Sequence, residues 1–228
     1  FGEVARYVIV PGDPNRVPFI AESLENVINQ GQNREFNAYK GTYKGIDVSV
    51  VSTGIGCPST AIAVEELSHI GAEVFIRIGT SGSVDKSAKK GDIFIATAAV
   101  RDDGTSKQYI PIEFPAIASH NVVSSLIKAS KNLNIDSKVG ICQSKDSFFG
   151  ETEPERMPVA PYLDFKWKSW QQGGVGASEM EAATLFTLSQ IKRLEAGAIL
   201  AIETSDKETI KKMTEIVLES ITYMEREK

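Results

Sequence analysis

Hydrophobic and polar residues follow two alternating patterns along the chain. Short apolar runs typical of buried strands lie at 7–10, 46–51, 74–78, 92–96, 138–143 and 196–202. The apolar spacing of a helix lies between them, at 15–29, 59–70, 119–133, 179–193 and 207–225. In the fourth of these helices, Leu185, Leu188 and Ile191 are expected to face the core. The alternation predicts an α/β fold around a mixed sheet, and since no linker or repeat divides the chain, one domain over residues 1–228.

Composition and charge exclude several classes of protein. Hydrophobic residues make up 42% of the 228 residues and charged residues 24%, which excludes a disordered, collagenous or coiled-coil chain. The net charge is −5 and no basic stripe appears, which argues against a nucleic-acid surface. No apolar run reaches the roughly 18 residues of a membrane span. We also expect no signal peptide, because the first residues do not show its pattern.

The cysteines indicate the redox compartment. Cys57 and Cys142 are the only two, and they form no CxxC pair. Two isolated thiols in a long chain are typical of a reduced cytosolic protein, so we expect a cytoplasmic location and two buried side chains. The chain begins with Phe1 rather than Met, so we expect the natural N-terminus to lie outside it.

Three glycine-containing turns fall at the ends of predicted strands, which is where α/β folds place their ligands. They are Gly12-Asp13-Pro14-Asn15-Arg16, Gly54-Ile55-Gly56-Cys57-Pro58-Ser59 and Arg77-Ile78-Gly79-Thr80-Ser81-Gly82. Glycine lets backbone N–H groups approach an anion, and arginine adds a forked donor for phosphate oxygens. Each turn alone is a weak signal. The second has Ser59 where a dinucleotide fingerprint needs its last glycine, and the chain contains no P-loop sequence.

Arg77 is unusual because it lies inside the apolar run 74–78. A buried arginine without a partner is costly, so its guanidinium must meet an anionic or hydrogen-bonding group. The local sequence leaves two partners open, a carboxylate of this chain or a bound anion.

Two further segments carry polar and aromatic side chains. Ser178 is expected to cap a helix whose first turn contains Glu179 and Glu181, and the alternative is that a carboxylate there accepts both hydroxyls of a sugar. Phe148 and Phe149 offer an aromatic face to a planar heterocycle, or else belong to the core.

Blocks of sequence spread along nearly the whole chain match one family in order. They are GDPNR, NREF, STGIGCPS, RIGTSGS, RDDGTS, YIPIEFPA, SKDSFFG, PERMPV and ASEMEAATLF. With these blocks the chain resembles the uridine phosphorylases of the nucleoside phosphorylase type I family. The resemblance implies a three-layer α/β/α fold with a partly closed mixed sheet, and a hexamer built from dimers with shared active sites. It also implies reversible, phosphate-dependent cleavage of uridine to uracil and ribose 1-phosphate, a pentosyltransferase reaction of pyrimidine salvage that needs phosphate and no further cofactor.

The resemblance assigns roles to individual residues. The phosphate positions are Gly12, Arg16, Arg77 and Thr80, with Arg34 donated by the neighbouring subunit. The ribose positions are Glu179, Met180 and Glu181, with Glu181 on the sugar hydroxyls. The base positions are Phe148, Glu151 and Arg156, with Arg156 donating to a base carbonyl. An intersubunit potassium site described in some members matches Glu35, Ile55 and Ser59. Catalysis is expected from Arg77, Glu181 and Arg156.

Glu151 departs from the family pattern, because uridine phosphorylases of this pattern carry glutamine there. A glutamine offers the base both a donor and an acceptor, whereas a carboxylate offers acceptors only. The base therefore stays open between uracil and a 6-oxopurine, whose N1–H a carboxylate would accept. A nucleosidase that uses water and an inactive nucleoside-binding relative are further alternatives. The three arginines disfavour the nucleosidase, because water needs no anion clamp.

Two segments of the family have no counterpart in this sequence. A histidine near the N-terminus that reaches a neighbour's ribose has no match before Phe1. The strand at 196–202 runs almost directly into the last helix, where the family has a longer lid-like segment. We expect a disordered lid that is missing from the numbered chain after about residue 202, rather than a deletion, because lids belong to the least stable parts of a fold.

Overall fold

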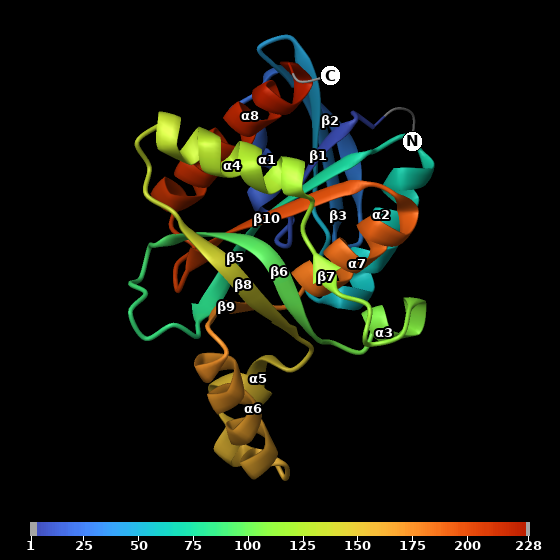
Figure 1. The fold of residues 1–228 in the computed structure, drawn as a ribbon. Helices are drawn as coiled ribbons and strands as arrows, with labels where there is room; N and C mark the ends of the chain where they lie inside the picture. The colour runs from blue at the N-terminus through green and yellow to red at the C-terminus, as the bar shows by residue number, and fades with distance from the viewer. Residues whose placement is uncertain (1–3, 227–228) are drawn as a thin grey trace.

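The computed structural model describes residues 4–226, and in this range ten strands form one mixed sheet (Figure 1). They are β1 (Tyr7–Pro11), β2 (Glu25–Asn33), β3 (Phe36–Tyr43), β4 (Ile46–Val51), β5 (Val74–Ser83), β6 (Ile93–Asp102), β7 (Ala116–Ile117), β8 (Lys138–Lys145), β9 (Val175–Glu179) and β10 (Glu195–Ile202). Their order is β10-β6-β8-β9-β5-β1-β4-β3-β2, with β7 paired to β6. Because β10 also pairs with β5, the strands β5, β10, β6, β8 and β9 close into a ring, which confirms the partly closed sheet.

Helices cover both faces of this sheet. The helical segments are α1 (Arg16–Ala21), α2 (Cys57–His69), α3 (Ser106–Tyr109), α4 (His120–Asn132), α5 (Phe148–Thr152), η1 (Pro154–Arg156), α6 (Ala160–Gln172), α7 (Ala182–Lys192) and α8 (Lys207–Arg226). Successive residues of a strand point to opposite faces, so Ile9 of β1 packs in one core with Leu126 of α4, while Val8 packs in the other with Val64 of α2. The α/β/α layering expected from the sequence is confirmed.

The six predicted strands and the helices near 59–70, 119–133 and 207–225 are present in the structure. Their ends differ most at β5 and β6, which continue beyond the apolar runs to Ser83 and Asp102. Cys57 and Cys142 are buried free thiols, as expected. Among the described residues, no helix combines the length and apolar character needed to cross a membrane.

The predicted helix at 15–29 is wrong beyond its first turns. Helix α1 ends at Ala21, and the residues from Glu25 onward form β2, an exposed strand. The apolar spacing of Ile20, Leu24 and Ile28 imitates a helix, but β2 forms an antiparallel ladder with β3 that has two register shifts. Backbone pairing to the next strand therefore outweighs the local pattern.

Two smaller predictions about the region 178–193 are also wrong. Ser178 is the fourth residue of β9 and caps no helix. Ile191 is 41% exposed, whereas Leu185 and Leu188 are buried as expected. Helix α7 therefore turns only its first part fully toward the core.

Helices α5 and α6 project from the body below β8 and β9 (Figure 1). Helix α6 has no buried residue, and Phe165 on it is 65% exposed. After β10 the chain passes through 203–206 directly into α8. The lid expected after about residue 202 stays a prediction.

Candidate active site

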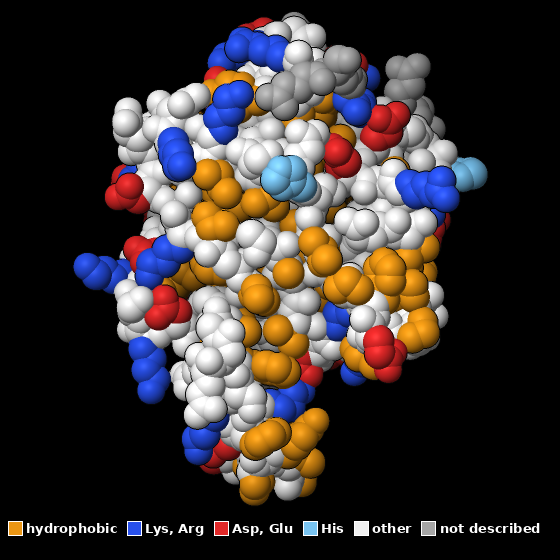
Figure 2. All heavy atoms as spheres, viewed as in Figure 1, with side chains coloured by type: hydrophobic (Ala, Val, Ile, Leu, Met, Phe, Trp, Pro, Cys, Tyr) orange, Lys and Arg blue, Asp and Glu red, His pale blue; other side chains and the backbone are white. Residues whose placement is uncertain are grey.

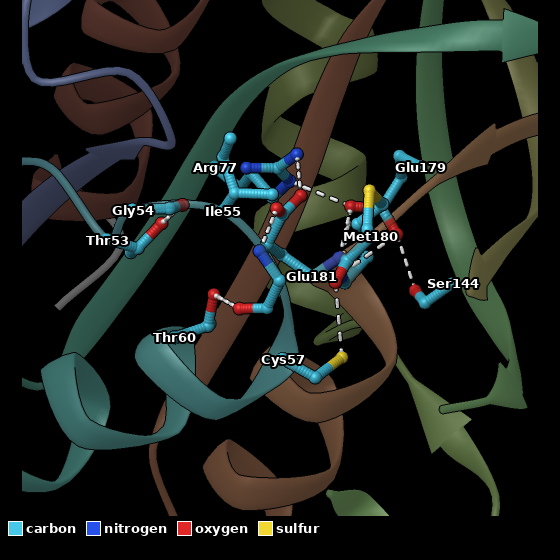
Figure 3. Close-up of polar contacts among 12 residues, drawn as sticks. Thr53, Gly54, Ile55, Cys57, Thr60, Arg77, Ser144, Glu179, Met180 and Glu181 are labelled. Atoms are coloured by element: carbon cyan, nitrogen blue, oxygen red, sulfur yellow. Dashed lines mark hydrogen bonds and ion pairs between the residues drawn. The ribbon is translucent and has the colours of Figure 1, made fainter. Parts of the chain in front are cut away.

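Arg77 of β5 forms a buried charge cluster with Glu179, the last residue of β9, and Glu181, which precedes α7 (Figure 3). Its Nε donates to Glu179 at 2.9 Å, and its Nη2 donates to Glu181. All three side chains are buried. Burial alone would lower the pKa of Arg77, but the two carboxylates outweigh it and raise that pKa. Of the two partners left open by the sequence, the structure shows the carboxylates of this chain.

Glu179 is committed to the protein itself. Its carboxylate accepts hydrogen bonds from the backbone N–H groups of Glu181 and Ala182 at 2.9 and 3.0 Å, and from the hydroxyl of Ser144. Glu179, rather than Ser178, therefore satisfies the N–H group of Ala182, the first residue of α7. With these contacts and Arg77, Glu179 fixes the turn that places Glu181.

Glu181 keeps acceptor capacity. Its Oε1 accepts from the Gly56 N–H at 2.6 Å, and its Oε2 accepts from Arg77, so each oxygen has one protein donor and one further lone pair. Gly54 and Gly56 have φ of 75° and 91°, which only glycine adopts easily, so the turn before α2 depends on them. Burial raises the pKa of Glu181, and the charge of Arg77 opposes this shift.

One nitrogen of the Arg77 guanidinium is unused. Its Nη1 is buried and has no hydrogen-bond partner within residues 4–226. A Cβ on Gly12 would lie 3.7 Å from this nitrogen and 3.2 Å from the carbonyl oxygen of Gly54, so a side chain there would fill this space. Arg16, at the start of α1, is partly buried, and its pKa is lowered by burial and by the positive charge of Arg77. An unused N–H group beside a second, partly buried guanidinium is a set of donors that suits a bound anion.

Three of the sequence-predicted site residues have exposed side chains. Arg34 lies in the β2–β3 turn with φ of 54° and an exposed side chain. Arg156 on η1 pairs with Glu153, and its side chain is 63% exposed. Phe148 is 53% exposed and meets Phe149 edge to face, so neither ring belongs to the core.

Glu151 lies beside β9 with a partner that the sequence analysis missed. Its Oε1 is 3.0 Å from Nζ of Lys145, and its Oε2 is 2.6 Å from Oγ of Ser178. A lysine two residues after the apolar run at 138–143 was the available signal, since a cation at a buried strand end needs a partner.

The residues matched to a potassium site lie together. Oγ of Ser59 donates to the carbonyl oxygen of Ile55 at 3.1 Å, and a Cβ on Gly54 would touch both Glu35 and Ser59. Their carboxylate, carbonyl and hydroxyl oxygens are ligands that hard cations prefer. No group of three or more His, Cys, Asp or Glu side chains in the described part of the chain forms a metal site.

Comparison with known proteins places these features in a family. A family model described as the phosphorylase superfamily matches residues 6–226. A uridine phosphorylase of Treponema pallidum (strain Nichols) is 45% identical over 200 residues, which cover 88% of this chain and 78% of the relative. A uridine phosphorylase of Thermococcus kodakarensis is 45% identical over 88% of this chain and 73% of the relative. A guanosine phosphorylase of Halorubrum lacusprofundi is 40% identical over 89% of this chain and 79% of the relative. With this match over nearly its whole length, the chain belongs to the phosphorylase superfamily.

Proposed function

We propose that the chain catalyses the reversible, phosphate-dependent cleavage of uridine to uracil and ribose 1-phosphate. One observation carries the proposal: the unused Nη1 of Arg77 lies beside Gly12, while Nη2 of the same guanidinium holds Glu181. An unused N–H donor that suits an anion and a carboxylate with free lone pairs thereby lie in one buried cluster. The names of the Treponema and Thermococcus relatives support uridine as the nucleoside.

Phosphate would bind between Arg16 and Arg77, with Gly12 and Thr80 beside it. Arg34 of the partner subunit would add a third guanidinium. Held below the anomeric carbon, the anion is both the nucleophile and the countercharge to an oxocarbenium-like transition state. Phosphate is already anionic at neutral pH, so the mechanism needs no general base.

The nucleoside would bind over this anion. Glu181 would accept the 2′- and 3′-hydroxyls with its remaining lone pairs, next to Met180. Phe148 would pack against the base. Arg156 would leave Glu153 and donate to a base carbonyl, which stabilises the negative charge that grows on the departing base.

A 6-oxopurine nucleoside phosphorylase is the second candidate. The carboxylate of Glu151 favours it, because a purine N1–H needs an acceptor, and one relative at 40% identity is named a guanosine phosphorylase. A hydrolytic nucleosidase fits less well, because Arg16 and Arg77 around an open N–H group suit an anion rather than water. An inactive nucleoside-binding relative is the remaining alternative.

The proposed enzyme is a homo-oligomer with shared sites, built from dimers into a hexamer. The exposed side chain of Arg34 supports this assembly, and so does the 79% exposure of Ile55, one of the candidate potassium ligands. Apolar side chains also gather on the surface over α3 and β7 (Figure 2), where Tyr109 and Ile117 are exposed. Glu35, Ile55 and Ser59 would hold a potassium ion between two subunits, where it would fix the interface and supply no chemistry.

Base release from uridine, thymidine, inosine and methylthioadenosine, each with and without phosphate, tests the proposal. We expect release from uridine that requires phosphate. Faster base release from inosine than from uridine would establish the second candidate, a 6-oxopurine nucleoside phosphorylase. Release without phosphate would establish a nucleosidase, and no release from any of them would establish a binding protein.

A further inference from the structure

Lys145 is a buried cation next to Glu151, and the proposed mechanism does not use it. Its ammonium lies 3.0 Å from Oε1 of Glu151 and donates to Oγ of Ser178 at 2.8 Å. The side chains of Lys145 and Glu151 are 9% and 13% exposed. An ammonium carries three N–H groups, so these two contacts leave one donor, and Glu151 keeps acceptor capacity on both oxygens.

The pair lies where β8 and β9 end, in the same sheet as the candidate active site. Ser178, which contacts both members, directly precedes Glu179 in β9 and pairs with Gly82 of β5. A Cβ on Gly82 would lie 3.5 Å from Oε1 of Glu151, so the absent side chain leaves the carboxylate open toward the end of β5.

A cavity adjoins the pair. Lys145 and Glu151 line it together with Ser147, Gly150 and Trp167, and its volume is 340 Å³. This volume lies in the range of small-molecule sites. Most of the residues that line the cavity are polar or charged, and its apolar part includes Leu163, Trp167 and Trp170.

We propose that Lys145 and Glu151 together read the base, and that they select a lactam, a ring N–H next to a carbonyl group. Glu151 accepts the ring N–H, and the remaining N–H of Lys145 donates to the neighbouring oxygen. The glutamine expected at position 151 would offer a donor and an acceptor from one amide, whereas here the ion pair divides the two roles between two side chains. This assignment rests on the proposed function and names the class of base that the site takes.

The lactam rule separates the common bases into two groups. Uracil, hypoxanthine and guanine carry a ring N–H beside a carbonyl group, while cytosine and adenine present an unprotonated ring nitrogen there. An unprotonated nitrogen would face the Glu151 carboxylate acceptor to acceptor, which a polar site rejects strongly. Two relatives are named uridine phosphorylase and guanosine phosphorylase, and the same pair would accept the bases of both nucleosides, uracil and guanine.

The test compares four proteins on uridine and cytidine: the wild type, Lys145→Met, Glu151→Gln and the double variant. Lys145→Met removes the donor, and we expect kcat/KM for uridine to fall about 10- to 150-fold, the range for a lost hydrogen bond to a charged group. The double variant regains a donor and an acceptor from the amide, so its activity on uridine should recover. The ratio of kcat/KM for uridine to that for cytidine should fall in Lys145→Met and return in the double variant.

Lys166→Met is the matched control, because Lys166 lines the same cavity and pairs with Asp102 instead. We expect it to leave the uridine-to-cytidine ratio unchanged. If the Lys145–Glu151 pair only holds α5 against the sheet, Lys145→Met will lower the melting temperature and reduce both nucleosides equally. That result would overturn the proposal.

Calorimetric binding of free uracil, hypoxanthine and cytosine separates this proposal from the proposed function. The wild type should bind uracil and hypoxanthine and reject cytosine. A protein with this preference that cleaves no nucleoside would refute the proposed function and leave the base-reading pair standing. A protein that cleaves uridine but binds cytosine as well as uracil would refute the pair and leave the function standing.

Discussion

Arg77 donates through Nη2 to the carboxylate of Glu181, and this contact joins the two halves of the candidate active site. The guanidinium comes from the middle of β5, and the carboxylate from the turn between β9 and α7. Both side chains are buried, so the charge of each determines the electrostatic environment of the other. An anion at the free Nη1 would therefore be sensed by Glu181, and the proposed phosphate and ribose sites form one unit.

Substitution of Arg16 tests the proposed phosphate site without removing a member of the Arg77–Glu179–Glu181 cluster. Arg16→Ala removes a partly buried guanidinium that makes no ion pair with Glu179 or Glu181. We expect the KM for phosphate to rise about 10- to 150-fold, as for a lost charged hydrogen bond, with little change in melting temperature. Initial rates at varied phosphate concentration measure this effect. Arg193→Ala, at the far end of α7, is the control, and an equal rise there would contradict the assignment of Arg16.

The ribose half is tested by Glu181→Gln. The amide keeps the shape but lacks the charge that strengthens hydrogen bonds from the sugar hydroxyls by about 1.5–3 kcal/mol. We expect kcat/KM for uridine to fall about 10- to 150-fold. Glu215→Gln, on α8, is the control for a lost carboxylate. Wild-type kinetics for Glu181→Gln would remove this residue from the sugar site.

Sharing of sites between subunits is tested by mixing two defective variants. Arg34→Ala and Arg16→Ala each damage every site in their own oligomers. In a hybrid dimer, one of the two sites combines an intact Arg16 with an intact Arg34. Random exchange should therefore restore about a quarter of the wild-type activity. An exchanged mixture with no more activity than the separate variants would show that Arg34 serves no neighbouring site.

Asp206 gives a prediction about stability and pH. Its carboxylate accepts from the Thr204 hydroxyl and from the N–H and hydroxyl of Thr209, and these bonds lower its pKa from 3.8 to about 2. Since the pKa is lower in the folded state, the stabilisation from Asp206 is present above pH 3.8 and is lost as the pH falls toward about 2. The melting temperature of Asp206→Ala should be lower than that of the wild type at neutral pH. This difference in melting temperature should become smaller as the pH falls toward about 2.

Melting temperatures across this pH range measure the difference. Asp136→Ala is the control, because Asp136 is an exposed carboxylate in the turn before β8. If the difference in melting temperature between Asp206→Ala and the wild type stays constant down to about pH 2, the hydrogen bonds from Thr204 and Thr209 do not stabilise the ionised carboxylate.

The sequence predicted the parts of the fold in which local pattern and final environment agree. The run around Ile76 is apolar because β5 is buried on both faces, and periodicity detects such strands. Periodicity failed at Ile28, where an exposed strand is held by its ladder to β3, and at Ser178, where a strand residue stands just before a helix. Ile28 depends on pairing with the next strand, and Ser178 on pairing with Gly82, which is distant in sequence.

The candidate site was predictable to a similar extent. Arg77 stood out because a charge within an apolar run needs a partner, and the resemblance supplied Glu181. The role of Glu179 in capping α7 and the contact of Glu181 with Gly56 required the folded chain, since Gly56 and Glu181 lie far apart in the sequence. Lys145 was missed because its partner Glu151 lies in α5, a helix too short to leave a periodic signal.

Simultaneous measurement of both products from uridine tests the central claim most directly. Uracil release is followed by absorbance, and the phosphorus resonance of ribose 1-phosphate is followed by NMR in the same sample. If Arg77 and Glu181 bring phosphate to the anomeric carbon, one ribose 1-phosphate will appear for each uracil, and neither will form without phosphate. Uracil accompanied by free ribose would contradict phosphorolysis.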